Sequence, residues 1–168
     1  KTNEHLRDLH SLRENGYTGV ILIEKPLFQN HTEIAEKHDN QIFVAYNLRF
    51  HPIIQKLRQC LASEKIISVH VYVGSYLPQW RPNRDYRKSF SAKKAEGGGV
   101  LRELSHELDY LNWLLNGWTG LFAIGGHYSS LETDSGDVFG ILMRFNHCPI
   151  VTLQMNFIDR TGHRQILV

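Results

Sequence analysis

Apolar residues in the first part of the chain fall into two different patterns. Leucines recur at helical spacing and predict a helix over residues 3–15, which Gly16 ends. Residues 20–23 and 42–46 are instead short, continuously apolar runs, which are typical of strands buried on both faces of a parallel sheet. A short helix is expected between them, over residues 31–38. This order predicts a βαβ unit with a right-handed crossover.

Beyond these elements the pattern changes to longer helices and alternating strands. A helix is expected over residues 52–64, and residues 67–74 then alternate apolar and polar, which predicts a strand with one covered face. A long connection over residues 78–99 leads to a second strong helix over residues 100–115. Three more strands are expected at residues 119–127, 137–146 and 150–159, the last two joined by a hairpin turn at 146–149, and a fourth begins near Arg164.

The two patterns predict an α/β chain in two parts. Residues 1–47 have the character of βαβ material, and residues 48–168 that of an α+β domain in which helices cover an antiparallel or mixed sheet. The chain has 168 residues, 42% of them hydrophobic and 21% charged, so it can bury a real core.

Charge and cysteine usage exclude several kinds of partner and site. The net charge of +2 is too small to argue for nucleic acid or a membrane surface, and no apolar run approaches the ~20 residues of a membrane span. Cys60 and Cys148 stand far apart in no metal-ligand spacing, so a reducing cytoplasm is expected rather than a disulfide framework. Basic residues gather only in the connection 78–99, as a solvated loop or a loop for an anionic ligand: Arg81, Arg84, Arg87, Lys88, Lys93 and Lys94.

Polar segments follow both predicted parallel strands. Glu24, Lys25 and Pro26 come directly after the first strand, at the edge where ligands of open α/β sheets bind. A lysine there can hydrogen-bond a cofactor ribose or a substrate oxygen and stabilise a developing alkoxide, or it is a surface lysine before a turn-forming proline. Residues 46–52 offer tyrosine, asparagine, arginine and histidine donors suited to hydroxyls or phosphates, or form a polar linker.

The predicted helix over residues 100–115 carries the most informative constellation. Glu103 and Asp109 each stand three residues from His106, so both carboxylates are expected within its reach. They would raise the histidine pKa and suit it to general acid/base exchange; the alternative is a helix buried on both sides with a merely hydrogen-bonded histidine. One leucine stripe is expected to face the core, and the opposite side is expected to hold Glu103, His106, Asp109, Tyr110 and Trp113.

Two further readings of this region are weaker. Glu103-x-x-His106 has the spacing of one di-iron ligand pair, but no second pair occurs, so no metal is expected. Gly97, Gly98 and Gly99 precede the helix and either let backbone approach a ligand or form a hinge; they match neither a Walker loop nor a GxGxxG fingerprint.

Taken together and in this order, these segments resemble the Gfo/Idh/MocA oxidoreductase family, which includes glucose–fructose oxidoreductase and inositol dehydrogenase. The matching pieces are residues 20–27, 46–52 and 97–109, so the resemblance runs through nearly the whole chain. Each motif is modest alone, but the ordered set is fairly specific. Residues 77–82 with Asp85 and Tyr86 look like a branch of the family associated with bacterial surface-sugar pathways.

The resemblance implies a Rossmann domain, of which residues 1–47 would be the C-terminal part. Residues 48–168 would be the substrate-binding and oligomerisation domain, with an open, mostly antiparallel sheet. It implies NAD or NADP, a sugar substrate and hydride transfer at a sugar carbon. Lys25 would match the catalytic lysine and His106 the acid/base histidine, with Glu103 as its acidic companion. Glu24, Pro26, Asn47 and Arg49 would lie at the cofactor, and Trp80, Arg81, Tyr86 and Asp109 would hold the sugar.

Two departures from the family pattern matter. The family helix usually has Asp-x-x-x-His where this chain has Glu103-x-x-His106, which leaves open whether Glu103 or Asp109 partners the histidine. The Gly-rich dinucleotide fingerprint is missing, so the chain is expected to be a fragment that binds a dinucleotide poorly by itself. The same absence leaves NAD and NADP undistinguished. The leading hypothesis is part of an NAD(P)-dependent sugar oxidoreductase, and the alternative is a non-catalytic oligomerisation or ligand-binding module.

Overall fold

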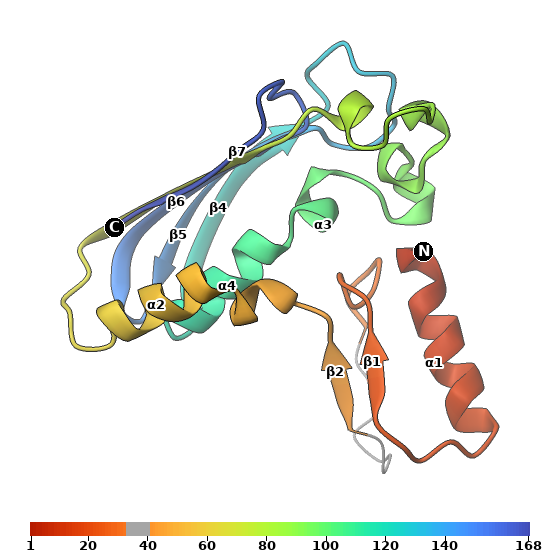
Figure 1. The fold of residues 1–168 in the computed structure, drawn as a ribbon, viewed down its shortest axis with the longest axis horizontal. Helices are drawn as coiled ribbons and strands as arrows, with labels where there is room; N and C mark the ends of the chain where they lie inside the picture. The colour runs from red at the N-terminus through yellow and green to blue at the C-terminus, as the bar shows by residue number, and fades with distance from the viewer. Residues whose placement is uncertain (33–40) are drawn as a thin grey trace.

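The computed structural model describes residues 1–32 and 41–168, and these residues form two sheets with separate hydrophobic cores. Figure 1 shows the smaller sheet beside the N-terminal helix and the larger, curved sheet above a layer of helices. Both parts were expected from the sequence, and the site described below lies where they meet.

The smaller unit contains α1 (His5–Glu14), β1 (Ile21–Ile23) and β2 (Ile42–Val44). A 3-10 turn (Thr2–Glu4) precedes α1. The two strands pair in parallel, as predicted, with Ile21 opposite Ile42. The helix expected over residues 31–38, and with it the hand of the crossover, falls largely outside the described residues.

The smaller sheet differs from the prediction in its burial. Leu9 of α1 packs with Ile21 and Ile23 into a small core, but Leu22 is 70% exposed and Phe43 is 54% exposed. Side chains alternate along a strand, and among the described residues only one face of this sheet is covered. The expectation of strands buried on both faces was therefore wrong for the residues that the structure describes.

The larger sheet has the strand order β4-β5-β6-β3-β7. Neighbouring strands are antiparallel except β3 and β6, which run parallel. Asn146 and His147 make the predicted hairpin turn between β5 and β6. The fold class predicted from the sequence is thus confirmed, and each strand lies within a few residues of its expected position. The strands are β3 (Ser68–Gly74), β4 (Trp118–Gly126), β5 (Val138–Phe145), β6 (Cys148–Asn156) and β7 (His163–Leu167).

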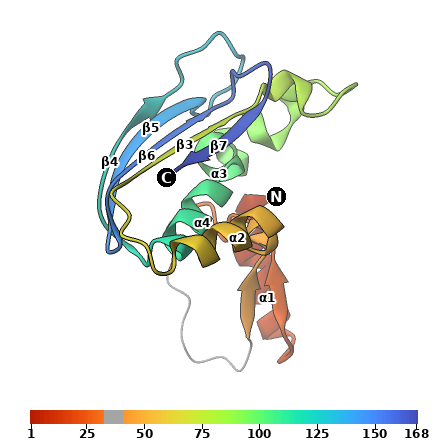
Figure 2. The same ribbon diagram turned by 60° about the vertical axis from the view of Figure 1, so that its left-hand side comes forward.

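The described helices all lie on one face of this sheet, and none of them covers the other face (Figure 2). They are α2 (Pro52–Leu61), α3 (Val100–Glu103) and α4 (His106–Leu114). The period-two pattern of β3 is confirmed, because Val69, Val71 and Val73 all point into the covered core. No helix in the described part of the chain is long and apolar enough to cross a bilayer.

The single helix expected over residues 100–115 is two helices, α3 and α4, interrupted at Leu104 and Ser105. Leu104, Leu111 and Leu115 face the core, as the leucine stripe predicted. Tyr110 was expected on the opposite side but is fully buried in the same core. A break shifts the helical phase, so a stripe extrapolated through it assigns some side chains to the wrong face.

The connection before α3 folds into four short 3-10 turns and ends in glycines with special backbone requirements. The turns are Leu77–Gln79, Tyr86–Lys88, Phe90–Ala92 and Lys94–Glu96. Gly99 has φ +109°, a conformation that other residues rarely adopt. Gly98 packs directly on neighbouring backbone, since a Cβ there would lie 2.2 Å from the carbonyl oxygen of Phe90 and 2.6 Å from that of Ser91. These glycines therefore fix the path of the chain into α3.

Replacing Gly98 with alanine is expected to destabilise the fold by about 1–3 kcal/mol, because the added methyl group meets backbone rather than a movable side chain. Denaturant unfolding of the variant measures this loss. Gly140→Ala is the matched control, since a Cβ at Gly140 would meet nothing within 4 Å. Equal losses in the two variants would contradict the close-packing argument.

Candidate functional site

Lys25 leaves the carboxyl end of β1 and reaches across to the larger domain. Its Nζ donates a 2.5 Å hydrogen bond to the backbone carbonyl oxygen of Glu103. The side chain is half-buried, and burial lowers the pKa of Lys25, partly offset by the charges of Glu103 and Glu107. The peptide bond from Lys25 to Pro26 is cis. The hydrogen bond to Glu103 and the partial burial together hold the Lys25 side chain in a defined place.

The break between α3 and α4 makes this contact available. In an unbroken helix the carbonyl oxygen of Glu103 would accept from the N–H of Glu107. Here that N–H donates to the carbonyl oxygen of Leu104 at 3.4 Å. The freed carbonyl group of Glu103 is the acceptor that Lys25 uses.

Arg102 fixes α3 against the loop that carries Lys25. Its guanidinium group donates to the carbonyl oxygen of Gln29 at 3.0 and 3.2 Å and to that of Gly98 at 3.0 Å. His5 of α1 holds the same loop, with Nδ1 at 3.2 Å from the carbonyl oxygens of both Pro26 and Leu27. Contacts from both parts of the chain therefore position Lys25.

His106 begins α4 next to this lysine. Its Nδ1 is buried and has no hydrogen-bond partner among the described residues, while the ring packs edge-on against Tyr46 with centroids 5.7 Å apart. Burial, together with the positive charges of Lys25 and Arg164, lowers the pKa of His106 to about 4. The imidazole is therefore neutral over the physiological pH range.

The expected carboxylate partners of His106 are engaged elsewhere. The Glu103 carboxylate accepts a 2.8 Å hydrogen bond from Ser91, and Asp109 forms a two-point ion pair with Arg49 at 2.5 and 2.7 Å. The prediction of a raised histidine pKa was consequently wrong. The spacing along one helix indicated that Glu103 and Asp109 lie near His106. It could not indicate that Ser91 and Arg49, from other segments, bind these two carboxylates instead.

The remaining cofactor candidates lie at the ends of the parallel strands. Glu24 follows β1 and Asn47 follows β2, and both side chains are exposed. Arg49 is half-buried, and besides Asp109 it lies 5.9 Å from the ring centre of Trp113. Glu24 and Asn47 therefore lie at the carboxyl ends of β1 and β2, and Arg49 joins the segment after β2 to α4.

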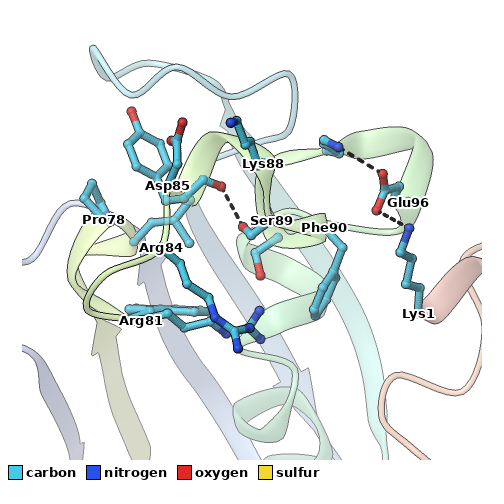
Figure 3. A pocket seen from close by; sticks show the side chains of 14 residues that line it. Lys1, Pro78, Arg81, Arg84, Asp85, Lys88, Ser89, Phe90 and Glu96 are labelled. Atoms are coloured by element: carbon cyan, nitrogen blue, oxygen red, sulfur yellow. Dashed lines mark hydrogen bonds and ion pairs between the residues drawn. The ribbon is translucent and has the colours of Figure 1, made fainter.

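Trp80, Arg81 and Tyr86 lie away from this point, in the connection between β3 and α3. They line a cavity of about 520 Å³, part of which Figure 3 shows from close by. Trp80 donates from Nε1 to the hydroxyl group of Ser75 at 2.5 Å, and the Tyr86 hydroxyl group accepts from the backbone N–H of Glu132 at 3.0 Å. The structure thus separates the expected substrate residues into Asp109 beside His106 and a second group around this cavity.

The cavity is connected to the lysine by one short chain of contacts. Ser91 lines the cavity and is almost completely buried, and its hydroxyl group donates to the Glu103 carboxylate. The backbone carbonyl group of the same glutamate holds Lys25. Glu103 therefore contacts both regions, although no bond joins it to His106.

Glu107 and Arg164 form a pair that the sequence analysis did not find. The Glu107 side chain is fully buried and accepts a 2.5 Å hydrogen bond from Nε of Arg164 on β7, while its second oxygen has no partner among the described residues. Burial raises the pKa of Glu107, opposed by Arg164. A signal was present, because Glu107 stands three residues after Leu104 and four before Leu111 on the buried stripe, where a charge needs a partner.

The comparisons with known proteins agree with this architecture. The profile of the GFO/IDH/MocA C-terminal domain matches residues 54–168. The chain belongs to the GFO/IDH/MocA family. The resemblance seen in the sequence is therefore confirmed. A sequence search of curated proteins finds no match.

Solved structures of oxidoreductases share the fold of this family member. GenD2 from gentamicin A biosynthesis, in complex with NAD, has a TM-score of 0.78 at 19% identity, over 98% of this chain and 48% of GenD2. The WlbA dehydrogenase from Bordetella pertussis, in complex with NADH and UDP-GlcNAcA, has a TM-score of 0.79 at 17% identity, over 98% of this chain and 53% of WlbA. Levoglucosan dehydrogenase, in complex with NADH and levoglucosan, has a TM-score of 0.79 at 17% identity, over 98% of this chain and 48% of that enzyme.

The chain spans about half the length of these structures. At such identities the likeness concerns the fold, in which both the β1–β2 unit and the five-stranded sheet take part. Within residues 1–32 and 41–168, no three histidine, cysteine, aspartate or glutamate side chains come together as metal ligands.

Proposed function

We propose that the protein carrying this chain is an NAD(P)-dependent oxidoreductase that moves a hydride between nicotinamide and a sugar carbon. Residues 1–47 belong to its dinucleotide-binding domain and residues 48–168 to its substrate domain. The observation that carries the proposal is the pairing of a half-buried Lys25 with a neutral His106 at the carboxyl edge of β1. A role in bacterial surface-sugar metabolism and a cytoplasmic location belong to the same proposal.

The residues at this edge fit a nicotinamide. Glu24 and Asn47 present exposed polar side chains at the carboxyl ends of two neighbouring parallel strands, where ligands of such sheets bind. The buried Nδ1 of His106 has no partner among the described residues. Glu24, Lys25, Pro26, Asn47 and Arg49 would hold the cofactor as NAD or NADP. When bound, the nicotinamide supplies the hydride acceptor or donor.

Lys25 and His106 would manage the proton of the sugar hydroxyl group. In the oxidative direction neutral His106 accepts this proton, and the Lys25 ammonium group stabilises the negative charge that develops on the oxygen as the C–H electron pair leaves. In the reductive direction the histidine returns the proton. The Glu103 carbonyl group keeps Lys25 aimed at the oxygen.

Arg49 and Asp109 would position His106 by forming an ion pair with each other. Their two-point ion pair ties the segment after β2 to α4 and so fixes the direction in which His106 projects. Asp109 retains acceptor capacity toward a sugar hydroxyl group, because a carboxylate accepts more than two hydrogen bonds. Trp80, Arg81 and Tyr86 would hold a more distant part of the substrate.

The pH dependence of sugar oxidation tests this assignment. The base form of His106 is present above its pKa of about 4, so kcat/KM is expected to stay level through pH 6.5 and to fall only near pH 4 to 5. His106→Gln is expected to lower kcat by about 100-fold and to remove this acidic limb. His70→Gln, on the open face of the sheet, is the control and leaves the profile unchanged.

Titration of the protein with NADH and NADPH, followed by fluorescence, separates this proposal from a non-catalytic module. Binding of either cofactor together with sugar-dependent hydride transfer supports an enzyme. If the full-length protein that carries this chain binds neither cofactor, the ligand-binding or oligomerisation alternative is favoured. The 168-residue chain alone is expected to bind neither cofactor tightly.

The open face of the large sheet supports self-association of two copies. Phe122 and Ile124 of β4 are each 62% exposed, Leu142 of β5 is 51% exposed, and Leu167 of β7 is 59% exposed. These side chains line a hollow on one face of the sheet. None of the described helices lies on this face (Figure 2). In a dimer with two-fold symmetry, this apolar surface of one copy would be buried against the same surface of the second copy.

Exchanging Phe122 and Leu142 for lysine is expected to weaken dimerisation at least about tenfold, because like charges and lost apolar area then oppose the contact. Analytical ultracentrifugation measures the dissociation constant. Ile53→Lys changes a residue on α2 that is 69% exposed but lies away from the sheet face, and it leaves dimerisation unchanged. A wild-type protein that stays monomeric would contradict the proposal.

A further inference from the structure

The cavity between β3 and α3 is unusual in its charge. It measures about 520 Å³, and Trp80, Tyr86 and Phe90 contribute aromatic walls. Figure 3 shows Arg81 and Arg84 on one side of it, Phe90 across from them, Lys88 at the rim and Glu96 at the far end. Such walls suit the apolar face of a sugar ring or another flat group.

Both acidic side chains that line the cavity are already neutralised. Asp85 accepts two side-chain hydrogen bonds from Arg87, at 2.8 and 3.0 Å. Glu96 pairs with the Nζ groups of Lys1 at 2.9 Å and Lys93 at 3.2 Å. No acidic side chain of the cavity is therefore left to balance the other basic groups.

Arg81, Arg84 and Lys88 are those remaining groups. All three are exposed, and in the described part of the chain none has a carboxylate within ion-pair distance. The guanidinium carbon of Arg81 lies 5.4 Å from the ring centre of Phe90, so this cation is already held over the cavity by an aromatic surface. Because these three like charges have no ion-pair partner among the described residues, they repel one another, and an anionic ligand would relieve this repulsion.

We propose that this cavity binds the phosphoryl part of a phosphorylated sugar, with Arg81, Arg84 and Lys88 as its ligands. This inference rests on the proposed function and names the class of its substrate. Three unpaired cations exceed the single charge of a carboxylate and match the two or more charges of a phosphate ester or diphosphate. Arginine also presents paired donors that fit phosphate oxygens.

The position of the cavity agrees with a substrate that extends from it to the reacting centre. Ser91 forms part of its lining and bonds to Glu103, whose carbonyl group holds Lys25. A phosphoryl group at the arginines would therefore anchor one end of a molecule whose sugar carbon lies toward the lysine. Binding energy from this remote anchor is available to orient the reacting carbon.

Calorimetric titration with inorganic pyrophosphate tests the site without cofactor or turnover. The Arg84→Gln/Lys88→Gln double variant is expected to lose about 100-fold in affinity, since hydrogen bonds to charged groups are each worth about tenfold. Lys56→Gln, an exposed lysine of α2 outside the cavity, is expected to bind as the wild type does. Wild-type affinity is also expected to fall steeply with added salt.

Titrations with three further ligands distinguish which kind of anionic group the cavity binds. Uridine diphosphate and glucose 1-phosphate report whether a diphosphate or a single phosphate fits better, and either result supports the proposal. Glucuronate carries a carboxylate, and equal binding of it with the same dependence on Arg84 and Lys88 would overturn the phosphoryl assignment. Unchanged pyrophosphate affinity in the double variant would overturn the site itself. Neither outcome depends on hydride transfer, so the proposed function stands or falls separately.

Discussion

A Lys25→Met variant of the protein that carries this chain is expected to lose about 10²- to 10⁴-fold in kcat for sugar oxidation. The ammonium group that stabilises negative charge on the hydroxyl oxygen during proton removal is then missing. Methionine keeps the length of the side chain but can neither donate to the Glu103 carbonyl group nor stabilise an alkoxide. The loss is expected in kcat more than in KM, since the charge it stabilises exists mainly in the transition state. The absorbance of the reduced nicotinamide follows the rate.

Controls separate this chemical role from a structural one. Lys56→Met removes an exposed lysine on α2 and is expected to leave kcat unchanged. In the Lys25→Met protein the pKa of His106 is expected to rise, because the ammonium charge that lowers it is gone. The acidic limb of any residual activity would then move to higher pH. Turnover by Lys25→Met at the wild-type rate would refute the catalytic assignment.

Arg164→Met is expected to destabilise the fold strongly. It leaves the fully buried Glu107 carboxylate without its partner, which is expected to cost about 2 kcal/mol, less than for a fully buried pair because the Arg164 side chain is 44% exposed. Chemical denaturation at neutral pH measures the loss in the free energy of unfolding. Arg144→Met is the matched control, because Arg144 is an exposed strand arginine for which the structure gives no ion pair.

The destabilisation has a definite pH dependence. Burial raises the pKa of Glu107, and removing Arg164 takes away the main contribution that opposes this shift. A carboxyl group whose folded-state pKa lies above its unfolded value favours folding when it is protonated, and this contribution is lost as the pH rises through the folded pKa. Arg164→Met is therefore closest to the wild type in acid and furthest from it in alkali. Equal losses across that range, or in Arg144→Met, would contradict the buried-pair account.

The local pattern of apolar and polar residues was sufficient to predict the strands of both sheets. Alternation along β3 correctly predicted its covered face, and the apolar run Ile21–Ile23 correctly predicted a parallel strand. The ordered motifs around Lys25 and His106 were brought into one region by the fold. Patterns of this kind depend on neighbours in sequence, which is why they survive without knowledge of the tertiary structure.

Features that depend on distant partners were not predicted. The break between α3 and α4 coincides with a bond from Lys25 to Glu103, which stand 78 positions apart. The Glu107–Arg164 pair spans 57 positions, and Arg49 captures Asp109 from 60 positions away. Burial of His106 and the charges of Lys25 and Arg164 keep the imidazole neutral, and no periodicity within one helix contains this information.

The interruption at Leu104 and Ser105 also has a consequence for sequence variation. Because α3 is anchored by glycines and Arg102 while α4 is anchored by its own core contacts, a one-residue insertion or deletion in the joint need not propagate through both helices. Such a change would rotate His106 by about 100° around the α4 axis if that helix kept its axis, whereas sliding α4 by one residue would restore its direction. The joint can thus absorb length differences, and alignments should allow a gap between Glu103 and His106 rather than force the acidic and histidine positions into a fixed interval.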